Sequence, residues 1–294
     1  MKVPLSSRGS MSSLITRVAN AMGEIAPLHL AERSWDNVGI LVESPASNNS
    51  GVVVLTIDLT PEVMEECLRQ NAEVIVAYHP PIFSSFKRLS LADPKQKMVL
   101  QTIRHGASIY SPHTALDAAV GGINDWLASI VDGTGRCHPI RASEYAAKDD
   151  NSPNSILSYS AAGVGRVVLM NEPKTMEALV QDIKQGLGLP TVRVSLPSGW
   201  TERKIVQRVA ICAGSGGSVF SLLKESVDVL LSGEMGHHDV LAANAMGQAV
   251  VLCEHSNTER GYLSRVLLHK LQQALGDGVQ VVVSTADKEP LVVW

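Results

Sequence analysis

Short apolar runs alternate with amphipathic segments along most of the chain, and this alternation predicts its secondary structure. The apolar runs are bounded by turn-forming residues, so they predict buried strands. These strands are expected at residues 40–42, 52–57, 74–77, 107–110, 166–170, 191–196, 205–213, 227–231, 249–252 and 279–283. Helices are expected at 12–25, 60–71, 94–105, 122–131, 173–187, 219–224, 239–246 and 262–275. Strands that alternate with helices are typical of a parallel or mixed sheet covered on both faces.

The length of the chain predicts two structural units. Its 294 residues are too many for one small domain and fit two compact ones. Residues 132–162 are rich in Gly, Ser, Asn and Asp. We therefore expect an N-terminal α/β lobe over residues 12–131, a linker or loop excursion over 132–162, and a C-terminal α/β lobe over 163–294. Each lobe is expected to have three layers, α/β/α, with a mixed sheet.

Composition narrows the classes of function. A hydrophobic content of 45% and a charged content of 18% permit an ordinary buried core. A net charge of −4 without a basic stripe, together with 4% aromatic residues, argues against direct nucleic-acid binding. No apolar run approaches the roughly 20 residues of a membrane helix, so no membrane partner is expected.

The cysteines indicate a reduced compartment. Cys67, Cys137, Cys212 and Cys253 lie far apart and form no CxxC pair, which favours neither a zinc ribbon nor a redox dithiol. We therefore expect a cytoplasmic location, with mitochondrial or nuclear locations as alternatives. The first 23 residues contain basic residues and serines but no acid, a composition that a transit peptide permits. A flexible start before the first helix is the simpler interpretation.

Imidazole and carboxylate side chains follow three of the predicted strands. They are His79, His113, Asp117, His255 and Glu259. Ligands of open α/β sheets bind just beyond the carboxyl ends of strands. Because these side chains are also common ligands of divalent metals, we expect the fold to bring the three turns together around metal ions.

Several of these residues also have an ordinary structural interpretation. Asp117 is typical of a cap on the helix that follows it. Ser256 and Glu259 fit the S-x-x-E capping box, in which the glutamate reaches back to the backbone. His255 would then precede the helix, and Glu259 would act both as cap and as ligand. A single histidine at a strand end, such as His79, is often only a polar tip.

A polar turn after residues 227–231 carries Glu234, His237 and His238. Adjacent histidines point in different directions, so at most one of the two is expected to serve a site, and a surface position is the alternative. The chain contains neither a G-x-S-x-G nucleophile turn nor an H-E-x-x-H sequence. A serine hydrolase triad and a zincin-type protease are therefore not expected.

Residues 214–218, Gly-Ser-Gly-Gly-Ser, follow a strand and precede a predicted helix. Their amides could bind an anion, although a tight turn is the simpler interpretation. Asp36 and the pair Lys87 and Arg88 lie in generic polar turns and predict little by themselves.

Five motifs, taken in order, resemble the NIF-three-like family (Ngg-one-interacting factor three-like). They are S-W-D-N-V-G at 34–39, Y-H-P-P-I-F at 78–83, S-P-H-T-A-L-D-A-A at 111–119, S-G-E at 232–234 and H-S-N-T-E-R-G at 255–261. Each motif is weak alone, but five in the family's order across nearly the whole chain are specific. The resemblance implies a two-lobed α/β protein with a dinuclear metal site in the cleft between the lobes, often assembled as a toroidal homohexamer.

By this resemblance the metal ligands are His79, Asp117, His255 and Glu259. Many members have two adjacent histidines in the second of these motifs, whereas this chain has Tyr78 at the first of the two positions. A phenol binds a hard metal only after losing its proton, and its ordinary pKa is near 10. We therefore expect either a weakly held ion at Tyr78 or a substitution by His113. The mixed nitrogen and oxygen set suits one or two divalent ions of Zn, Mn, Fe, Co or Ni per chain.

Two such ions can activate water and stabilise a displaced oxygen. We expect a metal-dependent hydrolase that acts on a nucleotide or another phosphorylated small molecule, with Glu234, His113 or Asp36 handling protons. The alternative is a non-catalytic metal-handling or transcription-associated protein with protein partners, which Tyr78 favours slightly. Some family members carry the name GTP cyclohydrolase I type 2 homologue, but no residue here specifically supports that activity.

Overall fold

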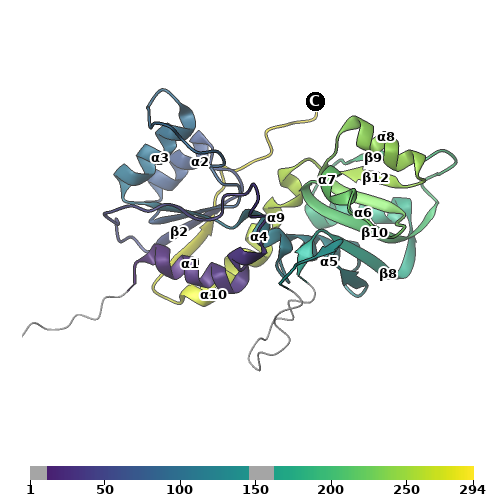
Figure 1. Cartoon of the computed structure of the whole chain (residues 1–294), viewed down its shortest axis with the longest axis horizontal. Helices are drawn as coiled ribbons and strands as arrows, with labels where there is room; N and C mark the ends of the chain where they lie inside the picture. Colours follow the sequence, from purple (N-terminus) through teal and green to yellow (C-terminus); the bar gives the residue numbers. More distant parts are fainter. Residues whose placement is uncertain (1–11, 146–161) are drawn as a thin grey trace, which may run out of the picture.

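A computed structural model describes residues 12–145 and 162–294 of the chain. They form two lobes that lie side by side, joined through α4 (His113–Ala118) and α9 (Arg260–Tyr262) (Figure 1). Each lobe contains a mixed sheet between two layers of helices, which confirms the predicted fold class. No helix among these residues is long and apolar enough to span a membrane.

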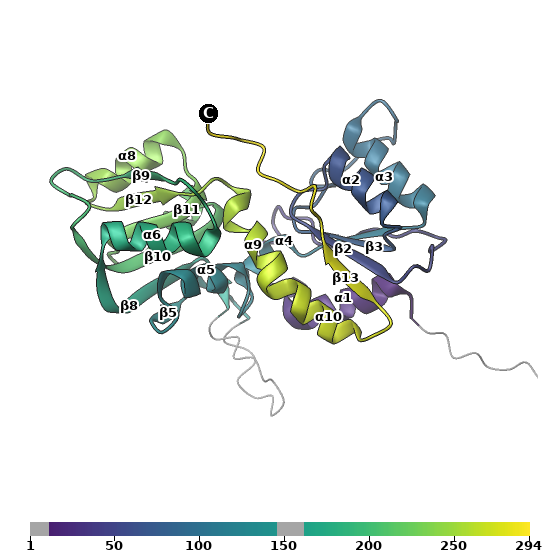
Figure 2. The same ribbon diagram turned by 180° about the vertical axis from the view of Figure 1, so that it is seen from behind.

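The first lobe is built on a five-stranded sheet of order β1-β4-β3-β2-β13. Its strands are β1 (Gly39–Val42), β2 (Val52–Thr56), β3 (Val74–Ala77), β4 (Ser108–Ser111) and β13 (Gln280–Val283). Strand β1 pairs antiparallel at one edge, and the other strands are parallel. Helices α1 (Leu14–Ile25) and α10 (Leu268–Leu275) cover one face, and α2 (Pro61–Arg69) and α3 (Pro94–His105) cover the other (Figure 2).

The sequence positions the ends of these helices through ordinary caps. The hydroxyl of Thr60 and the carboxylate of Asp93 accept backbone N–H bonds at the starts of α2 and α3, and a proline follows each of them. Helix α3 ends at Gly106, whose φ of 78° lies in the left-handed region that glycine adopts without strain.

The second lobe is built on a six-stranded sheet of order β5-β8-β10-β11-β12-β9. Its strands are β5 (Arg136–His138), β8 (Arg166–Thr175), β9 (Arg193–Ser195), β10 (Ile205–Ser215), β11 (Val229–Glu234) and β12 (Ala249–Leu252). Helices α5 (Ile123–Asp132) and α6 (Met176–Leu187) cover one face, and α7 (Gly217–Phe220) and α8 (His237–Ala245) cover the other. A small ribbon of β6 (Arg141–Ala142) and β7 (Gly163–Val164) lies apart from both sheets.

The lobes exchange segments, so their boundaries differ from the expected ranges 12–131 and 163–294. Helix α5 begins within the first range and ends one residue beyond it, but it packs on β8 and β10 of the second lobe. Strand β13 lies within the second range but pairs with β2 of the first lobe. Residues 136–138 of the expected linker form an edge strand, and residues 146–161 lie outside the described part. An amphipathic pattern shows that a segment has a buried face, but not which sheet it covers.

One apolar core runs through both lobes. It includes Leu55 of the first sheet and Ile211 of the second, and between the lobes Trp126 packs against Tyr262 with ring centroids 6.3 Å apart. The helix predicted over residues 262–275 is interrupted by a π-helical segment, Leu263–Leu267, before α10 begins. Cys67, Cys212 and Cys253 are buried free thiols.

Candidate metal centre

Three of the predicted ligands meet where the two lobes join. His79 follows β3 of the first lobe, whereas His255 and Glu259 follow β12 of the second. Each offers one ligand atom, and these atoms all lie within 4.8 Å of one another. The turns that follow two strands of different sheets thus converge. The preference of ligands for the carboxyl ends of strands predicts such convergence only for strands of one sheet.

The geometry of this group fits a metal ion. The Nε2 atom of His79 lies 3.5 Å from Oε2 of Glu259, and the Nε2 atom of His255 lies 3.4 Å from Oε1. Bonds of about 2.0–2.2 Å at tetrahedral angles place neighbouring ligand atoms roughly 3.3–3.6 Å apart. Glu259 is only 1% exposed, and its Oε2 atom accepts no hydrogen bond from the described residues. A nearby cation stabilises a buried carboxylate whose oxygen accepts no hydrogen bond, and the donor set here suits a divalent metal.

Each histidine of the group is oriented by a carboxylate on its other nitrogen. The Nδ1 atom of His79 lies 2.9 Å from Asp58, and the Nδ1 atom of His255 lies 2.9 Å from Glu234. This arrangement is typical of metal-binding histidines, whose second nitrogen is held by a carboxylate or carbonyl. Glu234 was predicted to handle protons, and in the structure it holds His255.

Asp58 is the residue of this centre that sequence reasoning missed. It lies just beyond the carboxyl end of β2, the same kind of position that singled out His79. Burial opposes protonation of His79, but the hydrogen bond with Asp58 and the nearby negative charge of Glu259 outweigh it and raise the pKa of His79 to about 10. Without a metal, His79 therefore carries a proton between two carboxylates.

The capping box predicted at Ser256 and Glu259 does not form. No side chain caps the 3-10 turn Ser256–Thr258 or helix α9. The hydroxyl of Ser256 donates instead to Glu289 at 2.6 Å and accepts a bond from Arg260 at 2.7 Å. The C-terminal segment thus takes the place of the box as partner of Ser256, and the carboxylate of Glu259 turns toward the histidines.

Asp117 lies beside the group without belonging to it. It sits within α4, a helix that the sequence pattern missed. Helix α5 begins at Ile123 with Gly122 as its N-cap, so the prediction that Asp117 caps that helix is wrong. The Tyr78 hydroxyl donates to Asp117 at 2.7 Å. Burial raises the pKa of Asp117 to about 6, and the charge of Glu259 adds to this increase, whereas Tyr78 and His113 oppose it. Two carboxyl groups that repel each other in this way favour a cation between them.

Tyr78 is a protonated phenol in this environment. Burial and the nearby charges of Asp117 and Glu259 raise its pKa well above the ordinary value. A neutral phenol that donates to Asp117 positions that carboxylate. Tyr78, at the first of the two positions where the resemblance implies adjacent histidines, therefore gives Asp117 a fixed partner.

His113 and Asp36 form a further imidazole–carboxylate pair. The Nδ1 atom of His113 lies 2.6 Å from Asp36, which also accepts bonds from the backbone N–H and the hydroxyl of Thr114. Burial raises the pKa of Asp36, but the hydrogen bonds from His113 and Thr114 outweigh it and hold that pKa below its ordinary value. The ring of His113 is centred 5.5 Å from that of His79.

Backbone conformation near the centre is unusual at two residues. His113 has a φ of 30° and Glu254, directly before His255, has a φ of 67°, both in the left-handed region that non-glycine residues seldom adopt. Such conformations cluster at functional sites, where the surrounding contacts hold them.

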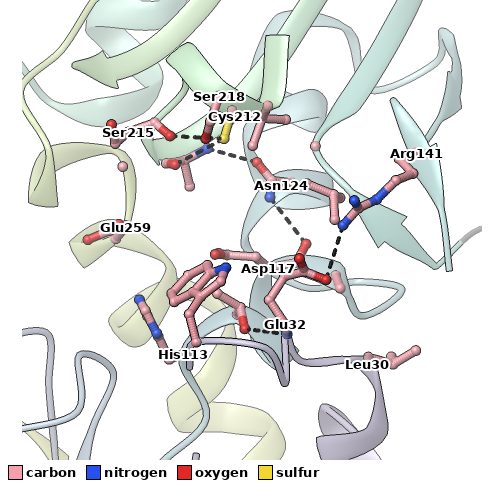
Figure 3. A pocket seen from close by; sticks show the side chains of 18 of the residues that line it. Leu30, Glu32, His113, Asp117, Asn124, Arg141, Cys212, Ser215, Ser218 and Glu259 are labelled. Carbon is pink, nitrogen blue, oxygen red and sulfur yellow. Dashed lines mark hydrogen bonds and ion pairs between the residues drawn. The ribbon is translucent and has the colours of Figure 1, made fainter. Parts of the chain in front are cut away.

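Two cavities flank the centre. The first, of about 540 Å³, is lined by Asp117, Glu259 and His113 (Figure 3). His255 also lines it. At its wall Asn124 joins the lobes, because it donates to the Asp117 carbonyl at 3.2 Å and accepts from the Ala213 N–H at 2.9 Å. The second cavity, of about 670 Å³, lies on the side of Asp58 and His79 and is also lined by Lys95 and Lys288.

Other predicted candidates lie elsewhere. His237 and His238 are exposed at the start of α8, with ring centroids 5.4 Å apart, and do not belong to the group. Lys87 and Arg88 are exposed and line neither of the two described cavities.

The glycine-rich turn at 214–218 was considered as an anion site, but in the structure its glycines make room for neighbouring side chains. A Cβ atom on Gly214 would lie 2.7 Å from Glu259 Oε1 and 2.8 Å from His255 Nε2. Gly214 therefore permits the close approach of two candidate ligands. A Cβ atom on Gly217 would meet the carboxylate of Asp239 at 2.7 Å, and this negative charge disfavours an anion at the turn.

These features define a class of two-lobed α/β proteins with histidine and carboxylate side chains at the lobe junction. The chain belongs to the Duf34/NIF3 (NGG1p interacting factor 3) family, whose model matches residues 13–290. This confirms the family resemblance of the five motifs.

Relatives in other organisms match over nearly their whole length. The chain is 40% identical to NGG1-interacting factor 3 of Saccharomyces cerevisiae, covering 98% of this chain and 99% of the relative. It is 41% identical to Protein NIF3 homolog of Schizosaccharomyces pombe, covering 97% and 99%. It is 33% identical to NIF3-like protein 1 of Homo sapiens, covering 98% and 94%.

Solved structures show the same fold at lower identity. A hypothetical protein of Staphylococcus aureus aligns with a TM-score of 0.76 and 23% identity over 95% of this chain and 99% of that chain. A Bacillus cereus protein related to NIF3 aligns with a TM-score of 0.76 and 20% identity over 95% and 98%.

Proposed function

We propose that the chain binds divalent metal at His79, His255 and Glu259 and hydrolyses a phosphorylated small molecule there. The observation that carries this proposal is the buried carboxylate of Glu259, whose Oε2 atom accepts no hydrogen bond from the described residues and whose two oxygens face the Nε2 atoms of His79 and His255. Metal bound here would supply an activated water and a Lewis acid for the displaced oxygen.

The surrounding residues have distinct roles in this proposal. Asp58 and Glu234 orient the two histidines so that each presents Nε2 to the centre. Asp117, which lines the same cavity as Glu259, would contribute to a second ion of a dinuclear site. His113 is a candidate to accept a proton, because Asp36 holds its Nδ1 atom and would stabilise the imidazolium.

The proposal is tested by His255→Ala, with His237→Ala as the matched control. His255 is partly exposed and lies in a turn, so its loss removes a ligand without opening the core. We expect His255→Ala to lower affinity for Zn²⁺ and Mn²⁺ at least about tenfold and to abolish turnover of a phosphomonoester and nucleotide panel. The exposed His237 on α8 is expected to be dispensable. Elemental analysis and activity assays measure both effects, and a wild-type protein that binds no divalent ion would refute the proposal.

A second candidate function is partner binding without turnover. The Saccharomyces cerevisiae relative, which is 40% identical to this chain, is named for interaction with NGG1. Under this alternative, the metal stabilises the lobe junction and a partner docks elsewhere. Metal binding that depends on His255, with no turnover of any substrate in the panel, would favour this function over hydrolysis.

A further inference from the structure

We propose that Trp35 and Phe83 form a subsite for a flat aromatic ring of the ligand, beside the candidate metal centre. This inference rests on the proposed function and specifies the class of its substrate. The ligand is an aromatic heterocycle that carries an anionic group, as a nucleotide does.

The first observation is the exposure of these two rings. Trp35 is 51% and Phe83 47% exposed, in a chain with four tryptophans and three phenylalanines. Their ring centroids lie 6.0 Å apart with an interplanar angle of 50°. Both side chains line the cavity of about 540 Å³ that also contains Asp117 and Glu259. The rings thus present apolar faces at the cavity that contains the charged centre, where a flat ring can stack.

The second observation is that hydrogen bonds of the neighbouring residues anchor the segments that carry both rings. Asp36, directly after Trp35, has a fully buried carboxylate bound to His113 and Thr114. The amide of Asn37 donates to the carbonyl of Ile82 at 2.5 Å, and Phe83 is the next residue. One network therefore connects the segments that carry the two aromatic rings with His113. A subsite held in this way is pre-organised, so binding loses little conformational entropy.

The third observation is the distance from the rings to the centre. The ring of His113 is centred 6.0 Å from that of Trp35, 6.4 Å from that of Phe83 and 5.5 Å from that of His79. The His113 ring therefore separates a ligand ring on Trp35 and Phe83 from the candidate metal ligand His79. Substituents on such a ring can reach the centre without movement of the lobes.

Two lysines near the centre indicate that the ligand also carries an anionic group. Phe83, His113 and His255 line both cavities, and the second of these contains the exposed cations Lys95 and Lys288. An aromatic ring at the first cavity and an anionic group toward these lysines would extend across the centre. This arrangement favours a heterocycle with a phosphate over a purely apolar ligand.

The test compares two probes that differ only in the aromatic ring. Adenosine 5′-monophosphate and ribose 5-phosphate carry the same phosphate, and binding of each is measured by isothermal titration calorimetry with Mn²⁺ present. Stacking of a base is worth a factor of about five or more in affinity, so the wild type is expected to prefer the nucleotide by at least that factor. Trp35→Leu and Phe83→Leu keep apolar bulk without a flat ring, and each is expected to reduce this preference severalfold.

Trp200→Leu is the matched control, because Trp200 lies in the second lobe with Lys204 5.2 Å from its ring centre. It is expected to retain the preference for the nucleotide. Equal affinity of the wild type for the two probes would overturn the inference, as would a preference that persists in both leucine variants. Light scattering measures the oligomeric state of the two leucine variants. A changed oligomeric state with the preference for the nucleotide intact would assign the two rings to contact between copies of the chain, and would also overturn the inference.

Failure of the subsite is distinguishable from failure of the proposed function. If the wild type binds metal but does not discriminate between the probes, only the subsite is refuted. If it binds no metal, the proposed function fails, and quenching of tryptophan fluorescence by adenosine 5′-monophosphate, lost in Trp35→Leu, still tests the aromatic subsite by itself.

Discussion

Single carboxylates decide which atom each candidate ligand presents. Asp58 holds Nδ1 of His79 and Glu234 holds Nδ1 of His255, so both Nε2 atoms face Glu259. Asp36 holds His113 in the same manner. In each of these pairs the partner comes from a distant part of the chain, so the orientation of the ring depends on the fold.

Asp58→Asn is expected to lower metal affinity about 10- to 100-fold, because an amide holds the His79 ring less firmly and makes it a weaker base. Asp182→Asn is the matched control, since Asp182 lies on α6 of the second lobe, pairs with Lys174 and lines neither of the two described cavities. Competition with a chelator measures both affinities. An unchanged affinity in Asp58→Asn would show that Asp58 does not orient His79 in the metal-bound protein.

At the scale of elements, the end of β10 packs against the turn that carries His255 and Glu259. The N–H of Gly214 donates to the Thr258 hydroxyl at 2.8 Å, and the Ser232 hydroxyl donates to the Gly214 carbonyl at 3.0 Å. Gly214 has a φ of 62°, and its missing side chain leaves room for the two candidate ligands. This glycine therefore serves both the backbone conformation and the close approach.

Gly214→Ala is expected to lower metal affinity at least about tenfold, because the new methyl group would displace the Glu259 carboxylate and the His255 ring. Gly188→Ala is a matched control, since Gly188 has a φ of 72° at the end of α6 and no atom near its potential Cβ. Both variants are expected to lose about 1 kcal/mol of stability from backbone strain. Thermal unfolding and metal titration separate the two effects, and equal metal affinity in both variants would contradict this role of Gly214.

At the scale of the whole molecule, residues 284–289 connect the turn that carries His255 and Glu259 with the first lobe. After β13, Ser284 and Thr285 donate to the buried carboxylate of Glu66 on α2. Further along, Asp287 lies 3.4 Å from Arg260, and Glu289 accepts from Ser256. After crossing the second lobe, the chain thus returns to the first lobe, and residues 287–289 lie beside the candidate centre.

Glu66 gives this connection a pH dependence. Burial raises its pKa, but the bonds from residues 284–286 outweigh it and lower that pKa to about 2 from an ordinary value near 4.5. Glu66 therefore stabilises the fold fully above pH 4.5, and this contribution is lost as the pH falls toward 2. Glu66→Gln is expected to lower the free energy of unfolding by about 2 kcal/mol at pH 7 and by much less at pH 2.

Denaturant unfolding at pH 7 and at low pH measures this difference. The neighbouring Glu65 is exposed, and Glu65→Gln is the matched control that should leave stability nearly unchanged. A loss of equal size at both pH values in Glu66→Gln would indicate a packing defect in place of a lost charged hydrogen-bond network.

The sequence by itself determined the elements and the identity of most candidate ligands. Apolar runs predicted strands such as β3 and β12 because a buried parallel strand must be apolar on both faces. His79, His255 and Glu259 were identified because polar side chains that follow such runs lie at the edge where ligands bind. These are local properties of the chain, and a single sequence displays them.

Only the tertiary structure decided how these parts combine. The return of β13 to the first sheet, the partnership of Ser256 with Glu289 in place of a capping box, and the orientation of His79 by Asp58 all join residues far apart in the chain. Short helical and capping patterns are weak compared with burial and long-range hydrogen bonds, so tertiary contacts overrode them. Packing alone buried the carboxylate of Glu259 between two imidazoles from different lobes.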